Sequence, residues 1–269
     1  MGGGIAQICA AAGYRVVLYD ADPAALERAI EAAHARLQRQ VERGELAAED
    51  RAGALERLSA EPDLGSLAAD IAIEAVPEIA AVKMDVLATL DDTLPAAAII
   101  ASNTSGLDIA ELAAATRRPD RVIGMHFFNP PPSMPLVEVV HTPETSEKTV
   151  RAVWSLAEAL GKTPISVANR PGFVVNRILI PMLNEAISAL QEGAATAEDI
   201  DRAMTLGARH PLGPLALADF IGLDVVLHIL ESFEERLGDG RYRPCDLLRA
   251  MVSRGDLGRK TDRGFFVYD

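Results

Sequence analysis

The chain opens with MGGGIAQ (residues 1–7), continues as a helical run to Gly13, and then reads RVVLYD (residues 15–20). A glycine-rich turn, a helix and a β-branched strand ending in an acid are successive parts of a dinucleotide-binding βαβ unit. In that unit the glycines and the helix N-terminus receive the pyrophosphate, and the acid binds the ribose hydroxyls. The acid here is Asp20, whose charge would repel a 2′-phosphate, so the pattern favours NAD over NADP.

Two parts of such a unit are not found ahead of this pattern: the first strand, and the first two glycines of G-x-G-x-x-G. In a doubly wound sheet that strand is central and buried on both faces. We therefore expect Met1 not to be the natural start, and an in-frame upstream extension to supply an apolar strand followed by Gly-x-Gly-x. Without it, we expect weaker NAD binding and a lower melting temperature.

Further apolar runs follow at residues 71–76 (IAIEAV), 98–101 (AIIA) and 122–128 (VIGMHFF). Continuous apolar character, with helical stretches between the runs, is typical of parallel strands covered on both faces. Residues 24–60 carry apolar residues at helical spacing around Gly44, which predicts a helical hairpin inserted between two strands. The sequence thus predicts an α/β Rossmann-type domain over residues 1–168.

A second domain is predicted after the break at Asn169–Gly172, because strand signals disappear from Phe173 onward. Its amphipathic runs predict a small all-helical domain over residues 171–269. Apolar stretches at Ile178–Leu183 and Phe220–Leu230 exceed what one helical layer can cover, so we expect a homodimer through this domain. The helical runs lie at residues 173–192, 197–207, 215–236 and 244–254.

Composition narrows the class of protein. The 269 residues carry a formal charge of −13, which argues against nucleic acid as a partner. No apolar run approaches the roughly 18 residues that span a bilayer, and the first residues lack the basic-then-apolar pattern of a signal peptide. Cys9 and Cys245 form no metal-binding spacing, so we expect no metal site and a cytoplasmic protein.

One histidine is distinguished by its surroundings. GMHFFNP (residues 124–130) is a strand that enters the proline-rich turn PPPS, and LVEVV (residues 136–140) is a second strand. Residue 132 lies midway between His126 and Glu138, so an antiparallel hairpin folded there places the two side chains opposite each other. A carboxylate beside an imidazole fixes its tautomer and stabilises its charged form, which suits the histidine to act as a general base.

Six motifs taken together carry a family resemblance: GGGIAQ (2–7), AVPE (75–78), SNTS (102–105), HFFNP (126–130), LVEVV (136–140) and GFVVNR (172–177). With them, the sequence resembles the L-3-hydroxyacyl-CoA dehydrogenase family along essentially its whole length, in particular short bacterial members that act on 3-hydroxybutyryl-CoA. The resemblance implies a Rossmann-type NAD domain and a helical dimerisation domain.

The resemblance also implies site residues. The family's catalytic pair falls on His126 and Glu138, and its substrate-contacting residues fall on Ser105 and Asn176. The predicted cofactor contacts are Gly2, Gly4, Asp20, Glu78, Lys83 and Asn103. Arg39 and Arg43, on the inserted hairpin, are either phosphate contacts of coenzyme A or ordinary surface arginines. Gly106 replaces a second serine, and Asp262 stands where the C-terminal pattern has glycine, a position Asp tolerates in the left-handed conformation.

The expected reaction is therefore NAD-linked interconversion of an L-3-hydroxyacyl-CoA and a 3-ketoacyl-CoA, in fatty-acid or butanoate metabolism. One alternative is a related 3-hydroxy-acid dehydrogenase that does not use coenzyme A. The other is a structural paralogue that has lost cofactor affinity.

Overall fold

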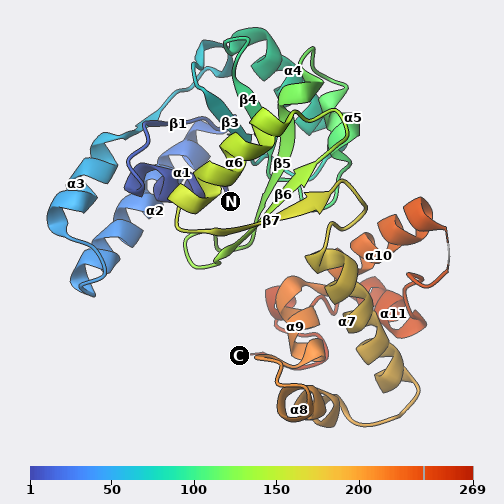
Figure 1. Cartoon of the computed structure of the whole chain (residues 1–269). Coiled ribbons are helices and arrows are strands. Elements are labelled where there is room, and N and C mark those ends of the chain that lie inside the picture. The colour runs from blue at the N-terminus through green and yellow to red at the C-terminus, as the bar shows by residue number, and fades with distance from the viewer. Residues whose placement is uncertain (239, 269) are drawn as a thin grey trace. The chain divides into compact units, whose positions relative to one another are not determined.

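The computed structural model describes residues 1–238 and 240–268 (Figure 1). The chain divides into two compact units, Met1–Arg170 and Pro171–Asp269. Within the described ranges, no helix is long and apolar enough to cross a membrane.

The first unit is an α/β unit with two sheets. The smaller sheet pairs β1 (Val16–Leu18) and β2 (Leu58–Ala60) in parallel. The larger sheet has the order β3-β4-β5-β6-β7, and all neighbours are parallel except the β5–β6 hairpin. Its strands are Ile71–Glu74, Ile99–Ser102, Val122–Phe127, Leu136–His141 and Thr163–Ala168.

Helices alternate with these strands, as the sequence predicts for a Rossmann-type unit (Figure 1). Asp22 begins α2 by accepting a hydrogen bond from the Ala24 N–H, and Pro23 is the first helical residue. The α-helices of this unit are α1 (Gly2–Ala11), α2 (Pro23–Glu42), α3 (Ala48–Glu56), α4 (Ala80–Thr93), α5 (Ile109–Ala113) and α6 (Glu147–Ala159). Short 3₁₀ turns lie at Leu64–Ser66 and Pro119–Arg121.

The hairpin expected over residues 24–60 differs at its end. Its last three residues form β2, because Leu58 pairs with Val16 and the Val16 N–H donates to the carbonyl of Arg57. Pairing with a neighbouring strand satisfies the backbone there, so the helix pattern is overridden.

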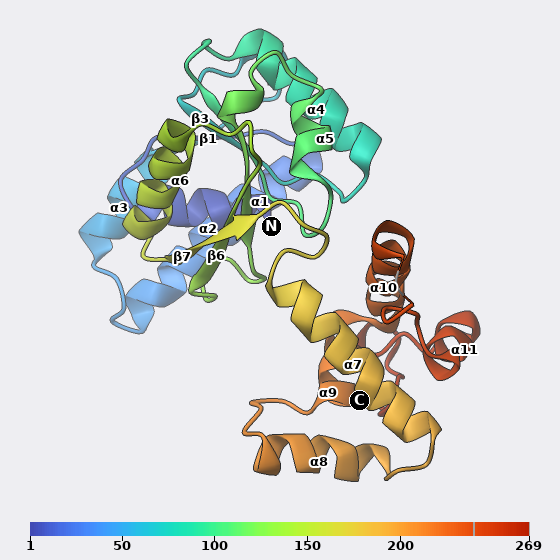
Figure 2. The same cartoon turned by 45° about the vertical axis from the view of Figure 1, so that its right-hand side comes forward.

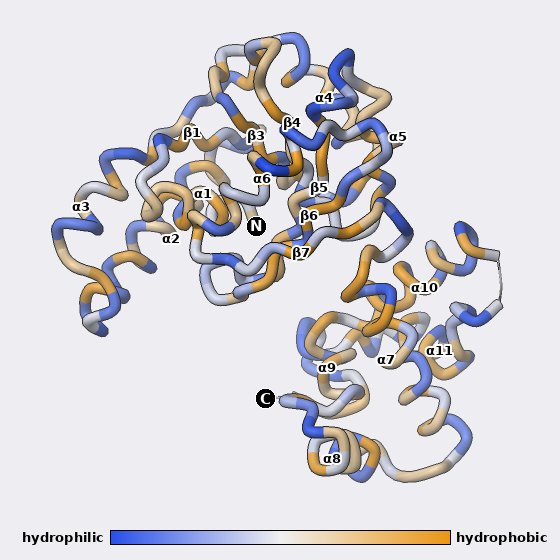
Figure 3. The backbone as a smooth tube through the Cα atoms, viewed as in Figure 1, coloured by the Kyte–Doolittle hydropathy of each residue, from blue (hydrophilic) through white to orange (hydrophobic). Residues whose placement is uncertain are grey.

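The core of the first unit explains its continuous apolar strands. Met125 and Phe127 of β5 are buried in a cluster with α1 and α6, and Ile109 of α5 lies against Gly124 on the opposite face. β5 is buried along its whole length, and the tube through β5 and β6 is largely orange in Figure 3. Successive side chains alternate between faces, so His126 lies on the side opposite Met125 and Phe127.

The second unit is all-helical, and α7 packs against α9, α10 and α11 (Figure 2). The single helix expected over residues 215–236 is wrong, because the chain breaks at Gly222, where φ is +104°. Glycine adopts that conformation without the penalty that a side chain would add. The α-helices are α7 (Val175–Gln191), α8 (Ala197–Gly207), α9 (Pro214–Ile221), α10 (Leu223–Leu237) and α11 (Asp246–Arg254).

The buried Asp219 of α9 holds residues 265–268 in place by hydrogen bonds. The Asp219 carboxylate accepts hydrogen bonds from the backbone N–H groups of Phe265 and Phe266 and from the Tyr268 hydroxyl. A Cβ at Gly264 would lie 1.9 Å from Asp219 Oδ1, so only glycine fits there. In the same segment Asp262 has φ +54°, which confirms that it adopts the left-handed conformation expected from the sequence.

Candidate active site

His126 and Glu138 face each other across the β5–β6 hairpin. The two residues are direct partners in the strand register, which confirms the pairing predicted from a turn centred on residue 132. His126 Nδ1 lies 2.7 Å from Glu138 Oε2. His126 is 5% exposed and Glu138 is fully buried, since β6 lies between β5 and β7 in the sheet.

This geometry determines what the imidazole can do. A carboxylate accepts hydrogen bonds, so the neutral histidine carries its proton on Nδ1, and Nε2 is the basic nitrogen of the ring. The imidazolium then formed is stabilised by the adjacent negative charge. The ring of Phe128 lies beside the imidazole, with centroids 4.6 Å apart, and limits its movement. The pair is thus built as an oriented acid–base group.

Glu78 organises the loop that carries Ser105. Its Oε1 atom accepts hydrogen bonds from the Thr104 hydroxyl at 2.5 Å and from the N–H groups of Ser105 and Gly106 at 2.8 and 3.1 Å. The loop follows β4 at the carboxyl edge of the sheet, where α/β sheets bind ligands. Glu78 therefore fixes the position of the exposed Ser105.

Asn103 joins this loop to the histidine strand. It is buried, and its Oδ1 atom accepts a hydrogen bond of 2.8 Å from the N–H of Phe127, the residue after His126. Its Nδ2 donors have no partner among the residues that the structure describes, so they are available to a ligand carbonyl.

Behind Glu78 lies a buried ion pair. Lys83 is 1% exposed, and its ammonium donates to Glu74 at 2.8 Å and to the carbonyl of Val76 at 3.1 Å. It also lies 3.4 Å from Glu78 Oε2. Glu74 in turn accepts from the Ser102 hydroxyl at 2.5 Å. Lys83, expected as a cofactor contact, is thus enclosed in an internal network.

Glu74 was not predicted as part of the site. The sequence did contain a signal, an acidic residue within the apolar run 71–76, because a buried carboxylate needs hydrogen-bonding or charged partners.

The N-terminal glycines differ from the expectation of a glycine-rich turn. Gly2 and Gly4 lie in the first turn of α1, since helix formation from Met1 satisfies the N–H groups of Gly4 and Ile5. Absence of a side chain still matters, because a Cβ at Gly4 would lie 3.2 Å from Pro131. Asp20 is exposed after β1, and its Oδ1 atom accepts a hydrogen bond from the Asp22 N–H.

The remaining predicted residues lie as follows. Asn176 is the second residue of α7 in the second unit and is half-buried. Its apolar neighbours in the sequence do not bury it fully, because Val174 and Ile178 are themselves exposed. Arg39 and Arg43 are exposed near the end of α2. Over the described part of the chain, no cluster of three or more His, Cys, Asp or Glu could hold a metal ion.

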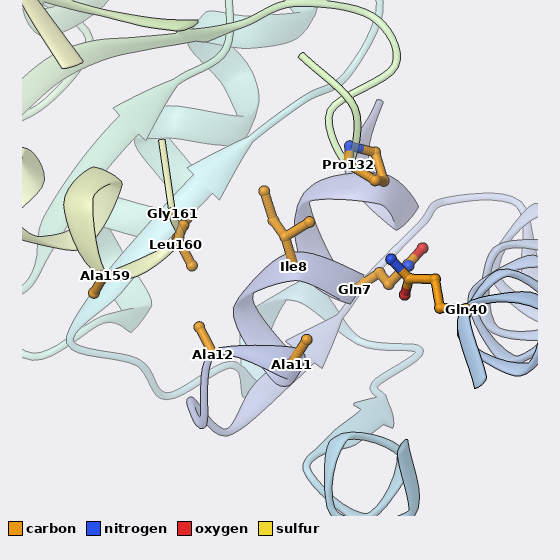
Figure 4. Close-up of a pocket in the computed structure, with 9 residues that line it drawn as sticks. All are labelled: Gln7, Ile8, Ala11, Ala12, Gln40, Pro132, Ala159, Leu160 and Gly161. Carbon is orange, nitrogen blue, oxygen red and sulfur yellow. The ribbon is translucent and has the colours of Figure 1, made fainter. Parts of the chain in front are cut away.

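A hollow of about 270 Å³ lies elsewhere in the first unit. Figure 4 shows Ile8 and Ala11 of α1, and Ala12 directly after it, opposite residues 159–161 at the end of α6, with Gln7 and Gln40 on another side. None of the residues predicted for the site lines it.

A mostly parallel α/β unit, with a buried His–Glu pair and a loop ordered by Glu78, is typical of dinucleotide-dependent oxidoreductases. Comparison with known proteins agrees. Residues 1–170 match the NAD binding domain of 3-hydroxyacyl-CoA dehydrogenase, and residues 172–268 match its C-terminal domain. The chain belongs to the 3-hydroxyacyl-CoA dehydrogenase family and is an NAD-dependent oxidoreductase.

Relatives at high identity support this assignment. A probable 3-hydroxybutyryl-CoA dehydrogenase of Bacillus subtilis is 50% identical, over 100% of this chain and 94% of the relative. A probable 3-hydroxybutyryl-CoA dehydrogenase of Deinococcus radiodurans is 47% identical, over 100% and 96%. The crystal structure of (S)-3-hydroxybutyryl-CoA dehydrogenase from Ralstonia eutropha is similar with a TM-score of 0.98 and 48% identity, over 100% of this chain and 95% of that one.

Proposed function

We propose that the protein interconverts L-3-hydroxyacyl-CoA and 3-ketoacyl-CoA, with 3-hydroxybutyryl-CoA as the substrate. The His126–Glu138 pair carries the proposal, because oxidation of a hydroxyl requires a group that accepts its proton. His126 Nε2 takes the proton of the 3-hydroxyl, and Glu138 holds the ring and stabilises the imidazolium. Ser105 and Asn176 orient the hydroxyl and the thioester carbonyl.

NAD would supply the hydride acceptor for the oxidation at C3 of the substrate. The first unit offers groups that suit it. The N–H groups of Gly2 and Gly3 lie at the open end of α1, where a helix receives a pyrophosphate, and these residues carry no side chain that would block it. The exposed Asp20 carboxylate is suited to the ribose hydroxyls, and the Asn103 amide to a carboxamide.

Four further residues of the first unit complete the proposed site. Glu78 and Lys83 order the loop beside the cofactor rather than supplying a free charge. The exposed Arg39 and Arg43 are suited to the phosphates of coenzyme A.

The test is NADH oxidation followed at saturating cofactor, with acetoacetyl-CoA and with free acetoacetate. We expect turnover of the thioester and little of the free acid. Equal or preferred use of the free acid would favour the dehydrogenase that does not use coenzyme A. Calorimetry that detects no NAD binding would favour the cofactor-impaired paralogue.

We propose a cytoplasmic enzyme with no nucleic-acid partner. Both cysteines are free, which suits a reducing compartment. Burial raises the pKa of the Cys9 thiol to about 12, so this thiol stays protonated and unreactive.

We also propose that the enzyme is a homodimer through residues 173–269. Ile178 is 66% exposed and Phe220 is 61% exposed, although the helices that carry them are otherwise packed. Light scattering at micromolar concentration should therefore give the mass of a dimer. Ile178→Asp should shift the mass towards the monomer, whereas Tyr14→Asp, at an exposed position of the first unit, should not. A monomeric parent protein would contradict the proposal.

A further inference from the structure

Lys162 is a buried cation that no carboxylate neutralises in the described part of the chain. It lies between α6 and β7 and is 9% exposed. Its ammonium donates to the carbonyls of Pro131 at 2.7 Å, Met134 at 3.0 Å and Pro132 at 3.4 Å. An ammonium has three N–H donors, so these three carbonyls use all of them.

Such an arrangement is costly, since burial disfavours the charged form and lowers the pKa of Lys162. The three carbonyls belong to one turn, the proline-rich turn of the His126–Glu138 hairpin. Because prolines have no N–H, this turn has few donors of its own, and the N–H groups of Ser133 and Met134 both donate to Pro130. Lys162 supplies donors that the turn lacks.

The backbone around Lys162 is itself fixed. Its N–H donates to the carbonyl of Ala157 at the end of α6, and Gly161 has the left-handed conformation that ends the helix, with φ +69°. On the other side, the Thr163 N–H donates a hydrogen bond of 2.7 Å to the carbonyl of Pro135. The backbone that carries the Lys162 side chain is therefore fixed by hydrogen bonds on both sides.

The turn that Lys162 holds lies against the first turn of α1. A Cβ at Gly4 would lie 3.2 Å from Pro131 Cδ and 3.3 Å from Pro132 Cδ. The same turn connects the strands of His126 and Glu138. The turn is thus a direct contact between the helix end proposed for the pyrophosphate and the hairpin that carries the base, beside the core packing of α1 against β5.

We infer that Lys162 is a positioning residue, which fixes the Pro131–Met134 turn against the first turn of α1 and so maintains the cofactor site beside the catalytic hairpin. This inference rests on the proposed function only in placing the pyrophosphate at α1. The strand ladder holds His126 and Glu138 in register independently of Lys162. Loss of the ammonium should therefore weaken cofactor binding more than it slows turnover at saturating cofactor.

The test compares Lys162→Met with Lys148→Met, an exposed lysine of α6, and with Asp20→Ala as a reference for the cofactor site. NADH affinity is measured by fluorescence titration at a temperature where circular dichroism shows each variant folded. We expect Lys162→Met to raise the Kd for NADH about tenfold, the equivalent of one hydrogen bond to a charged group. Its kcat at saturating NADH should stay within about threefold of the parent value, well below the loss expected for a catalytic base. Hydrogen exchange should accelerate in the peptide covering residues 128–136, and Lys148→Met should change none of these quantities.

The outcomes separate the inference from the proposed function. If Asp20→Ala weakens NADH binding and Lys162→Met does not, the positioning role is wrong and the cofactor site stands. If Asp20→Ala leaves the affinity unchanged while Lys162→Met weakens it and loosens the turn, the placement of the ribose is wrong and the role of Lys162 stands. A lower melting temperature alone, with unchanged affinity and exchange, would overturn the inference. Should Lys162→Met not fold, Lys162→Gln, which keeps two N–H donors, is measured in the same way with the same criteria.

Discussion

Replacing His126 with Ala should lower kcat by about 10²–10⁴-fold, the range typical for removal of a positioned general base. The imidazole is the proposed base, with Nε2 as its proton-accepting nitrogen, because Nδ1 lies 2.7 Å from Glu138 Oε2 and carries the proton that the carboxylate accepts. The Kd for NADH should change little, since the N-terminal turn of α1 and Asp20 are untouched. Steady-state turnover of acetoacetyl-CoA together with NADH titration measures both quantities.

A second histidine of the same hairpin provides the control. His141 ends β6, is half-buried, and lies 3.1 Å from the Ser166 hydroxyl through Nε2. His141→Ala should keep kcat within a few-fold of the parent enzyme. Turnover of His126→Ala near the parent value would remove His126 from the chemistry.

The largest effect on stability is expected at Glu74. Glu74→Gln removes the charge that faces the buried Lys83 ammonium, and breaking one side of a buried pair typically costs about 3–5 kcal/mol. Both side chains are at most 1% exposed, so water cannot replace the lost partner. Urea unfolding followed by the fluorescence of Trp154 reports on the first unit, because this is the single tryptophan of the chain and lies in α6.

Two variants make that result specific. The double variant Glu74→Gln with Lys83→Met should recover a large part of the loss, since no unpaired charge remains buried. Glu147→Gln breaks the exposed pair with Arg151, in which both side chains are more than two-thirds exposed, and should cost at most about 1 kcal/mol. Equal losses in Glu74→Gln and Glu147→Gln would show that the buried pair is not a stabilising network.

Local sequence patterns predicted much of the fold. Continuous apolar runs predicted β3, β4 and β5, because few residues are polar in a strand that is covered on both faces. The strand β7 was not predicted, since Thr163–Ala168 is an alternating edge strand that begins with Thr163 and Pro164, and proline is tolerated only at such an edge. The break at Gly222 was also missed, because the apolar spacing continues across it into α10.

The site was predictable where its geometry is local. His126 and Glu138 are joined by one turn, so their spacing alone gave their register. Glu74 and Lys162 depend on partners far along the chain: Ser102 is 28 residues from Glu74, and Pro131 is 31 residues from Lys162. Only the folded sheet brings those groups together, and in the sequence Lys162 reads as an ordinary lysine after a helix.

The most direct test of the account is a double-mutant cycle on kcat with His126→Ala, Glu138→Gln and the double variant. If Glu138 acts by orienting and stabilising the imidazole, Glu138→Gln should slow the parent enzyme substantially and add almost nothing once His126 is absent. Non-additive losses of this kind are the result that the hairpin geometry predicts. Losses that multiply independently, or a Glu138→Gln enzyme with the parent kcat, would contradict the central claim that the two residues form one catalytic unit.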